Sequence, residues 1–335
     1  MQDFRKTFEI FLKNGKKFPC FNNQTIFDAA ITAGIPLEHS CLAARCRSCI
    51  VKIKEGTAVD KNFDYVLSLE DKESNYTLSC NAIPTSDLIL DLEDLGERRI
   101  FEKKIVPAKI EAINKLNDSV MQVTMRLPPN SNFGYNSGQY VNIIKGQIKR
   151  SYSIANAYQS NGFLTFLIKK YENGLMSSYW FEEARINDLL RIEGPIGSFF
   201  LRETEIENIV FLATGTGVAP IKAMLEKINE SEKHISKKYW VFVGARYEKD
   251  LFLNLNEFNA ISNLTYVPVL SRGSEDWNGE RGYVQEILIK YNIPLTNAQV
   301  YACGSNDMIE SAKKLLIEKG LNNKNFFSDA FLATN

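Results

Sequence analysis

Short segments in which apolar and polar residues alternate dominate the first hundred residues. This alternation flanks Asn14-Gly15, a dipeptide typical of hairpin turns, and predicts two antiparallel strands over residues 4–12 and 16–18. Four further elements are predicted here: a helix opened by Thr25 and running through Ala33, a strand over 48–54, a capped turn over 68–73 and a strand over 76–81. The region therefore reads as a small α+β domain.

The middle of the chain is richer in strands. Between residues 105 and 168, short apolar segments are separated at regular intervals by turn residues, a pattern that predicts a small antiparallel barrel. The turns are expected at Asn117-Asp118, Pro128-Pro129, Asn136–Gly138 and Asn161-Gly162. A short helix is predicted over residues 175–181.

From residue 208 the pattern changes again, because continuous apolar runs now alternate with helical periodicity. The apolar runs are IVFLAT, YWVFVGA, TYVPVL and QVYACG, and the helical segments cover residues 219–228, 282–291 and 307–319. Buried strands alternating with helices are typical of βαβ units and predict a doubly wound parallel sheet.

These patterns predict a multidomain protein of mixed α+β and α/β class. A chain of 335 residues is too long for one core, and the pattern changes place domains at residues 1–97, 98–204 and 205–335. The first boundary falls where the acidic segment 87–97 is followed by a basic one. The acidic segment is interpreted either as a docking surface for a partner or as an ordinary solvated surface.

Composition and charge exclude several classes of protein. The 40 Lys+Arg balance the 40 Asp+Glu, which argues against a general polyanion binder, and neither nucleic acid nor a membrane is expected as a partner. No stretch approaches the ~20 apolar residues that span a bilayer, and the N-terminus lacks the apolar core of a signal peptide. The chain is therefore expected to be cytoplasmic, with reduced cysteines.

Four cysteines show a characteristic spacing. Cys41, Cys46 and Cys49 lie within one nine-residue loop, and Cys80 follows 30 residues after it. The spacing C-x4-C-x2-C with a distant fourth cysteine is that of plant-type 2Fe–2S ferredoxins. A four-cysteine zinc site is the alternative, but such sites usually present two C-x2-C pairs and this chain has one. The sequence therefore predicts a 2Fe–2S cluster on these four thiolates, in a β-grasp ferredoxin domain.

Two residues of the cysteine loop depart from the ferredoxin pattern. Ala44 and Arg47 stand where that loop usually has glycine, and Arg47 adds a charge beside the expected cluster. Both changes leave ligation intact but affect the expected hydrogen bonding and potential. Cys20 is interpreted as a small buried residue, and His39 as a loop residue rather than a ligand.

The next motif lies in the predicted barrel. Arg150-Ser151-Tyr152-Ser153 follows a strand that begins with Gly138-Gln139-Tyr140, and this pairing resembles the flavin-binding domain of the ferredoxin–NADP reductase superfamily. The resemblance implies that Arg150 binds the pyrophosphate of FAD, Tyr152 stacks on its ring system and Ser153 reaches its N5 edge. Gly174 and Ser177 resemble the second flavin element, a helix N-terminus facing phosphate.

A glycine-rich turn opens the third predicted domain. Gly215, Thr216 and Gly217, followed by Pro220, lie between an apolar strand and a helix, where backbone N–H groups can bind a pyrophosphate. The turn differs from the G-x-G-x-x-G fingerprint and matches the reductase superfamily instead. It is interpreted as the site of the nicotinamide nucleotide.

The end of the chain adds two candidates. Cys303 and Gly304 end the last apolar run, where doubly wound sheets bind ligands, and the resemblance places this cysteine near the nicotinamide. A purely structural buried thiol is the alternative for Cys303. The segment 326–331 resembles the aromatic tail that covers the flavin in relatives, and Phe331 is one candidate for that role.

The order of ferredoxin, flavin and nucleotide regions is similar to that of reductase components of bacterial mono- and dioxygenases. The blocks 150–157, 190–195, 300–305 and 325–331 most resemble the CDP-6-deoxy-Δ3,4-glucoseen reductase family. The resemblance implies an NAD(P)H-dependent oxidoreductase that passes electrons to FAD, to the 2Fe–2S cluster and then to a partner enzyme. The expected partner is the pyridoxamine-phosphate (PMP)-dependent dehydrase of 3,6-dideoxyhexose (CDP-sugar) biosynthesis, with an oxygenase component as the alternative.

Two further points stay open in the sequence. A redox-sensing or electron-carrier module with a merely structural nucleotide domain is a third reading, from a different functional class. For the cofactor, Arg246 could meet the 2′-phosphate of NADPH, whereas Glu248 and Asp250 would repel it, so NADH is the expected electron donor.

Overall fold

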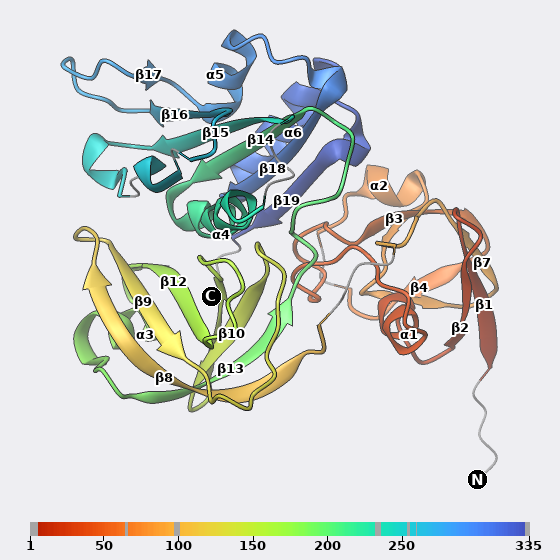
Figure 1. Cartoon of the computed structure of the whole chain (residues 1–335). Coiled ribbons are helices and arrows are strands. Elements are labelled where there is room, and N and C mark those ends of the chain that lie inside the picture. Colours follow the sequence, from red (N-terminus) through yellow and green to blue (C-terminus); the bar gives the residue numbers. More distant parts are fainter. Residues whose placement is uncertain are drawn as a thin grey trace. The chain divides into compact units, whose positions relative to one another are not determined.

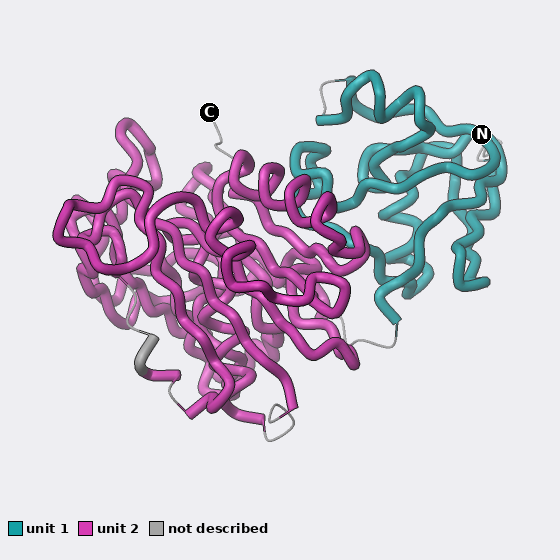
Figure 2. The backbone as a smooth tube through the Cα atoms, turned by 90° about the horizontal axis from the view of Figure 1, so that it is seen from above, with its two compact units in different colours: residues 1–100 teal, residues 101–335 magenta. Residues whose placement is uncertain are grey.

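The computed structural model describes residues 6–63, 66–96, 101–231, 236–252, 255–258 and 260–331. The chain divides into two compact units, residues 1–100 and residues 101–335 (Figure 2). The predicted boundary after residue 97 falls among residues 97–100, which lie outside the described residues.

Unit 1 is built on a five-stranded mixed sheet in the order β2-β1-β7-β3-β5. The elements of this sheet and its surroundings are β1 (Thr7–Leu12), β2 (Lys17–Phe21), α1 (Ile26–Thr32), β3 (Ile50–Glu55), the pair β4 (Ala58–Asp60) and β6 (Ala82–Pro84), α2 (Leu69–Glu73), β5 (Tyr76–Leu78) and β7 (Leu88–Leu90). Helix α1 packs on the sheet around a core that includes Ile10, Phe18 and Ile26. This is the predicted α+β arrangement of a ferredoxin domain.

The local signals explain these elements. Strands β1 and β2 form the predicted hairpin, and Gly15 in its turn has φ +83°. The hydroxyl of Thr25 accepts the N–H of Asp28 and caps α1. The predicted strand over residues 76–81 is wrong in its second half: the N–H of Asn81 bonds back to the carbonyl of Leu78, so Cys80 lies in a turn.

The first part of unit 2 is a six-stranded antiparallel barrel in the order β11-β10-β13-β8-β9-β12 (Figure 1). Its strands are β8 (Lys104–Lys115), β9 (Val120–Arg126), β10 (Tyr140–Lys145), β11 (Ile148–Ser153), β12 (Phe163–Lys169) and β13 (Leu189–Ile196). A bridge between Ile154 and Phe166 joins the two edges and closes the barrel. The predicted helix over 175–181 is present as α3 (Leu175–Ser178), continued by the π-helical turn η1 (Tyr179–Glu183).

The second part of unit 2 is a six-stranded parallel sheet in the order β17-β16-β15-β14-β18-β19. Its elements are β14 (Asn208–Thr214), η2 (Gly215–Gly217), α4 (Val218–Asn229), β15 (Lys238–Ala245), β16 (Leu264–Leu270), β17 (Glu280–Arg281), α5 (Val284–Lys290), β18 (Ala298–Gly304), α6 (Asn306–Glu318) and β19 (Phe326–Ala330), with short 3-10 turns η4 (Glu248–Asp250), η5 (Leu255–Phe258), η6 (Leu295–Asn297) and η7 (Asn323–Asn325). Helix α4 packs on one face, and α5 and α6 pack on the other. The doubly wound sheet is confirmed.

The barrel and the parallel sheet share one apolar core. Ala155, Leu167 and Phe199 from the barrel side pack with Phe211 and Met224 of the sheet and α4. Unit 2 is therefore continuous, and the boundary after residue 204 stays a prediction. Among the described residues, no helix is long and apolar enough to cross a membrane.

Candidate functional site

The four cysteines of the predicted cluster lie in two pairs. Residues 41–49, called the cluster loop below, hold Cys41, Cys46 and Cys49, and Cys80 approaches from the turn after β5. The sulfurs of Cys49 and Cys80 are 3.2 Å apart, and the side chains of Cys41 and Cys46, both free cysteines, form a hydrogen bond with each other. Two pairs of thiols suit the two irons of a 2Fe–2S cluster, each of which takes two thiolates. Among the described residues, no three His, Cys, Asp or Glu side chains lie close enough together to hold a single metal ion.

Backbone N–H groups of the cluster loop point at these sulfurs. The N–H groups of Ala43 and Arg45 each donate to the sulfur of Cys41 at 3.3 Å, and the N–H of Ala44 donates to Cys80. The pKa of Cys41 is lowered, first by the thiol of Cys46 and then by these N–H groups; the thiol of Cys49 does the same for Cys80. One thiol of each pair is therefore stabilised as a thiolate, the ligand form of cysteine, while hydrogen bonding to that partner raises the pKa of Cys46 and Cys49.

The two departures from the ferredoxin pattern keep the backbone conformation that glycine would favour. Ala44 has φ +58° and Arg47 has φ +60°, in the left-handed region. Ala44 is buried in a small apolar cluster with Cys49 and Leu78, and its carbonyl accepts the N–H of Val66. Contacts of these side chains and of this backbone therefore hold the loop in place.

Arg47 is neutralised rather than left as a free charge beside the cluster. Its two terminal nitrogens bind the two carboxylate oxygens of Asp71 at 2.7 and 2.8 Å. Asp71 also accepts the N–H of Ser68, while the hydroxyl of Ser68 caps α2. The pKa of Asp71 is held far below its usual range, first of all by the Arg47 guanidinium. The ion pair thus ties the cluster loop to α2.

The flavin motif of the sequence lies on strand β11. Ser153 is buried and lies opposite Tyr140 in the neighbouring strand β10. Arg150 is half-buried; its guanidinium donates to the carbonyl of Lys149 and forms no ion pair with a carboxylate in the part of the chain that the structure describes. A cation without a carboxylate partner suits an anionic pyrophosphate.

The second flavin element lies beside the first. Gly174 precedes α3, and Ser177 in that helix accepts the N–H of Tyr171 with its hydroxyl at 2.7 Å. The indole N–H of Trp180 donates to the hydroxyl of Tyr152 at 3.1 Å, which joins the turn after α3 to strand β11. This bond links Tyr152 to the helical segment that follows Gly174, and the assignment of FAD to these residues stays a prediction.

The glycine-rich turn Thr214–Gly217, called the nucleotide turn below, connects β14 to α4. A Cβ on Gly217 would lie 2.3 Å from the carbonyl oxygen of Cys303, and one on Gly304 would lie 2.1 Å from the hydroxyl of Thr214. That hydroxyl accepts the N–H of Ser305 at 3.3 Å. The ends of β14 and β18 are thus so close that side chains cannot fit between them. Pro220 is buried in the first turn of α4.

A cavity of about 840 Å³ lies beside this turn, between the barrel and the parallel sheet. Gly215, Thr216 and Gly304 line it on the sheet side, and Phe331 also contributes to its wall. Its size suits a dinucleotide. Within the described segment 326–331, Phe331 is the aromatic residue that lines this cavity, whereas Phe327 stacks on Tyr301 at 5.0 Å between ring centroids.

Cys303 is fully buried and is not among the residues that line the cavity. Burial and then the charge of nearby Asp329 raise the pKa of its thiol. The thiol thus stays protonated, and Cys303 meets the nucleotide turn through its backbone.

Sequence reasoning did not identify several residues of the cavity. Asn117, Lys169 and Tyr171 reach it from the barrel, and Gln285 reaches it from α5. The side-chain oxygen of Gln285 is buried without a hydrogen-bond partner in the described structure. Asn117 lies in a predicted turn, but only the fold shows that Asn117 and Tyr171 line the same cavity as the nucleotide turn.

Comparison with protein families gives three matches in chain order. Residues 11–85 match the 2Fe-2S iron-sulfur cluster binding domain, residues 107–201 the oxidoreductase FAD-binding domain, and residues 211–314 the oxidoreductase NAD-binding domain. The three cofactor predictions are therefore confirmed at the level of the domains.

Similar proteins cover nearly the whole chain. Protein RfbI of Salmonella typhimurium is 37% identical over 93% of both chains. A CDP-6-deoxy-L-threo-D-glycero-4-hexulose-3-dehydrase reductase of Yersinia pestis is 38% identical over 95% of this chain and 96% of the relative. Among more distant relatives, phenol hydroxylase P5 protein of Acinetobacter pittii is 29% identical over 93% of this chain and 90% of the relative.

Solved structures show the same fold. A cytochrome P450 reductase of Amycolatopsis superposes with a TM-score of 0.75 at 22% identity, over 97% of this chain and 99% of that one. A ferredoxin reductase of carbazole 1,9a-dioxygenase superposes with a TM-score of 0.69 at 21% identity, over 99% and 100% of the two chains.

Proposed function

Because this chain belongs to the family of iron–sulfur flavoprotein reductases that includes the hexulose-3-dehydrase reductases, we propose that its electron acceptor is a PMP-dependent dehydrase of CDP-sugar biosynthesis. The chain is an NAD/FAD/2Fe–2S electron-transfer oxidoreductase. The observation that carries the proposed partner is the identity of 37–38% with RfbI and the dehydrase reductases, against 25–30% for the oxygenase components among the relatives.

The residues that would hold the three groups are those predicted from the sequence. We assign the cluster to Cys41, Cys46, Cys49 and Cys80. We assign FAD to Arg150, Tyr152, Ser153, Gly174 and Ser177. We assign the nicotinamide nucleotide to Gly215, Thr216, Gly217, Pro220 and Gly304, and we assign Phe331 to the aromatic tail that would cover the flavin. When bound, the flavin supplies the conversion of a two-electron hydride donor into single electrons for the cluster.

In this scheme the residues of the chain bind the cofactors and orient them. The N–H groups of the nucleotide turn, whose residues Gly215 and Thr216 line the cavity, would bind pyrophosphate. Ser153 is buried on β11, where its hydroxyl would donate to the flavin ring. Cys303, which the sequence places near the nicotinamide, would act by packing against the nucleotide turn, since its thiol is fully buried.

The cavity supports NADH as the electron donor. Arg246 lines it, but Asp250 and Glu286 line it too and would repel a 2′-phosphate. The unpartnered oxygen of Gln285 accepts hydrogen bonds only, so it suits a ribose hydroxyl and not a phosphate. We also propose domain boundaries after residues 97 and 204 and a cytoplasmic location.

The second candidate acceptor is an oxygenase component. It is favoured by relatives such as the toluate 1,2-dioxygenase electron transfer component of Pseudomonas putida, which is 28% identical over 93% of both chains. The redox steps within this chain are the same in either case, and only the acceptor differs.

The test reconstitutes the purified protein, loaded with FAD and cluster, with NADH and one of two acceptors. We expect rapid electron delivery to a PMP-dependent dehydrase supplied with its CDP-hexulose, and slow delivery to an oxygenase component. Cys80→Ser is the matched control, because it removes one cluster ligand in unit 1 and should leave flavin reduction intact. Faster delivery to the oxygenase would refute the dehydrase as partner. If NADH bleaches neither flavin nor cluster, the reductase function itself is wrong.

A further inference from the structure

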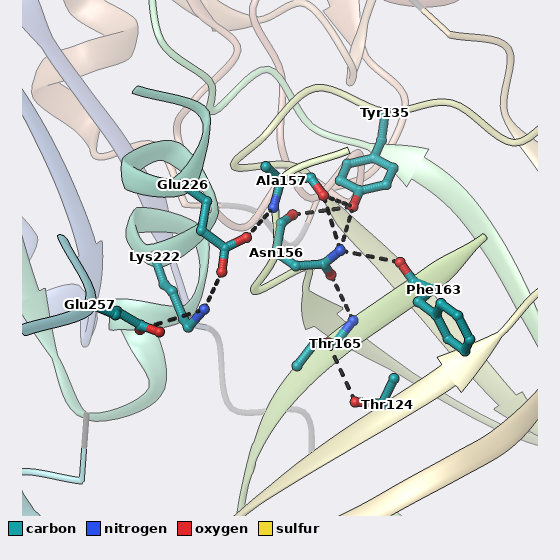
Figure 3. A network of polar contacts seen from close by, with 9 residues as sticks. All are labelled: Thr124, Tyr135, Asn156, Ala157, Phe163, Thr165, Lys222, Glu226 and Glu257. Carbon is teal, nitrogen blue, oxygen red and sulfur yellow. Dashed lines mark hydrogen bonds and ion pairs between the residues drawn. The ribbon is translucent and has the colours of Figure 1, made fainter. Parts of the chain in front are cut away.

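A polar network joins the barrel to helix α4 of the parallel sheet (Figure 3). The carboxylate of Glu226, in the third turn of α4, accepts the backbone N–H of Ala157 at 2.7 Å. The flavin motif ends at Ser153, and Ala157 follows it by four residues. One hydrogen bond thus connects the segment assigned to the flavin with the helix that begins at the nucleotide turn.

Glu226 is held in a defined orientation for this contact. Its other oxygen pairs with Lys222, one turn earlier in α4, and the side chain of Glu226 is 24% exposed. Lys222 in turn lies 3.7 Å from the carboxylate of Glu257 and near the ring of Phe258. A carboxylate with both oxygens engaged and little exposure loses less entropy on making its bond than a free surface side chain.

The barrel side of the contact is equally fixed. The side-chain nitrogen of Asn156 donates to the carbonyls of Ala157 and Phe163, and its oxygen accepts the N–H of Thr165 at 2.7 Å. The buried hydroxyl of Tyr135 donates to the carbonyl of Ala157 at 2.9 Å. The backbone that presents the Ala157 N–H is therefore bound from several sides and would not follow Glu226 if α4 moved.

From this arrangement we propose that Glu226 is a positioning residue that sets the spacing between the nicotinamide and flavin rings. The inference rests on the proposed NADH-dependent reductase function. Hydride transfer moves two electrons and one proton between two rings, and a misplacement of about 1 Å can lower such a rate by about a hundredfold. The apolar core shared by barrel and sheet holds the two parts together, whereas the Glu226–Ala157 bond adds the directional restraint.

The test compares Glu226→Ala and Glu226→Gln with wild type and with Glu230→Ala. Glu230 caps the same helix at its C-terminal end, and in the described residues it pairs with Lys227 at 3.3 Å and makes no hydrogen bond to the barrel, so its removal controls for a lost charge at α4. All four proteins are loaded with FAD and cluster. Anaerobic stopped-flow mixing then gives the rate of flavin reduction at saturating NADH, the Kd for NADH and the long-wavelength absorbance of the stacked ring pair, each per bound flavin.

We expect Glu226→Ala to lower the saturated rate about tenfold and to weaken the long-wavelength absorbance, with the Kd for NADH within about twofold of wild type. Glu226→Gln should lose about threefold, since its amide oxygen still accepts the Ala157 N–H without the charge. Glu230→Ala should match wild type. Rescue by glutamine is the result that a merely electrostatic role of Glu226 would not give.

Three results would overturn the proposal: an unchanged saturated rate per bound flavin in Glu226→Ala, a Kd for NADH raised well beyond twofold in that variant, or an equal loss of rate in Glu230→Ala. If Glu226→Ala does not retain flavin, the Glu226→Gln rate decides by the same criteria. If wild type itself is not reduced by NADH, the reductase function fails and this inference fails with it, which distinguishes that outcome from the other three.

Discussion

The cluster loop and the nucleotide turn both direct backbone N–H groups toward an expected anionic group, but they accommodate their unusual backbone differently. In the cluster loop, Ala44 and Arg47 occupy the left-handed region and are held by a small apolar cluster and an ion pair. At Gly217 of the nucleotide turn, and at Gly304 beside it, a Cβ would overlap a neighbouring carbonyl or hydroxyl oxygen.

The difference separates two reasons for glycine. A positive φ costs an ordinary residue roughly 1–2 kcal/mol, and contacts elsewhere can offset such a cost. An overlap of heavy atoms cannot be offset, because one of the two chain segments must move. Whether a glycine is needed for its positive φ or for lack of room for a Cβ is decided by the atoms around it, and its φ alone does not show this.

The largest effect is expected for Gly217→Ala. Gly217 has φ −60°, so alanine fits its backbone, but the new methyl group would lie 2.3 Å from the carbonyl oxygen of Cys303. We expect the free energy of unfolding of unit 2 to fall by about 3 kcal/mol. NADH affinity should drop more than tenfold, since β14 and β18 must separate at the binding site. Thermal unfolding and NADH titration measure both, and wild-type values for this variant would contradict the steric argument.

A smaller effect is expected at Arg47. Arg47→Ala removes a bidentate, half-buried ion pair and keeps the left-handed backbone, so we expect it to destabilise unit 1 by about 2 kcal/mol. Arg47→Gly removes the same ion pair but relieves the backbone, and its cost should be about 1 kcal/mol. The rate at which the visible cluster absorbance is lost in guanidinium gives the ranking.

The control for that comparison is Glu73→Gln, a change on an exposed residue of α2. It should leave the rate of cluster loss unchanged. If Arg47→Gly proves less stable than Arg47→Ala, the left-handed conformation at position 47 is not a cost that the ion pair offsets.

Gly215→Ala should lie next in the order. Gly215 has φ +55°, and a Cβ there would meet no atom within 4 Å. Gly215→Ala should therefore lower the free energy of unfolding by about 1 kcal/mol, because alanine strains the backbone there. It should add no steric overlap. Equal losses of unfolding free energy for the 215 and 217 variants would remove the distinction between conformation and space.

The smallest effect is expected for Ala44→Gly. Glycine relieves φ +58° but loses a buried methyl group that packs with Cys49 and Leu78. The two contributions are similar, about 0.8 kcal/mol for a methyl group and about 1 kcal/mol for the backbone, so the net change should stay within about 0.5 kcal/mol. Chemical unfolding of the loaded protein, followed at the cluster absorbance, checks this near-cancellation.

Local patterns predicted the elements and the cofactor classes well. The hairpin at Asn14-Gly15, the cysteine spacing and the glycine-rich turn after β14 are all short-range signals, and the fold places each as expected. The end of β5 was missed because a single hydrogen bond from Asn81 to Leu78 turns the chain before Cys80.

Long-range partners were beyond the reach of such patterns. Arg47 meets Asp71 across 24 residues, and Ala157 meets Glu226 across 69. Nothing in the residue types marks these pairs, because acidic and basic residues are common on solvated helices. Likewise, the role of Phe327 as a partner of Tyr301 follows from strand β19, whose pairing with β18 the sequence did not reveal.

Helix α4 also has a consequence for how this reductase evolves. The helix begins directly after the nucleotide turn, and Glu226 lies eight residues after Val218, which is about 12 Å along a rigid rod. A substitution that tilts the helix to suit a different nucleotide also displaces Glu226 from the barrel. A substitution selected for a new electron donor therefore also changes the rate of hydride transfer. Compensating changes are expected around residues 156 and 157, which are not among the residues that line the nucleotide cavity.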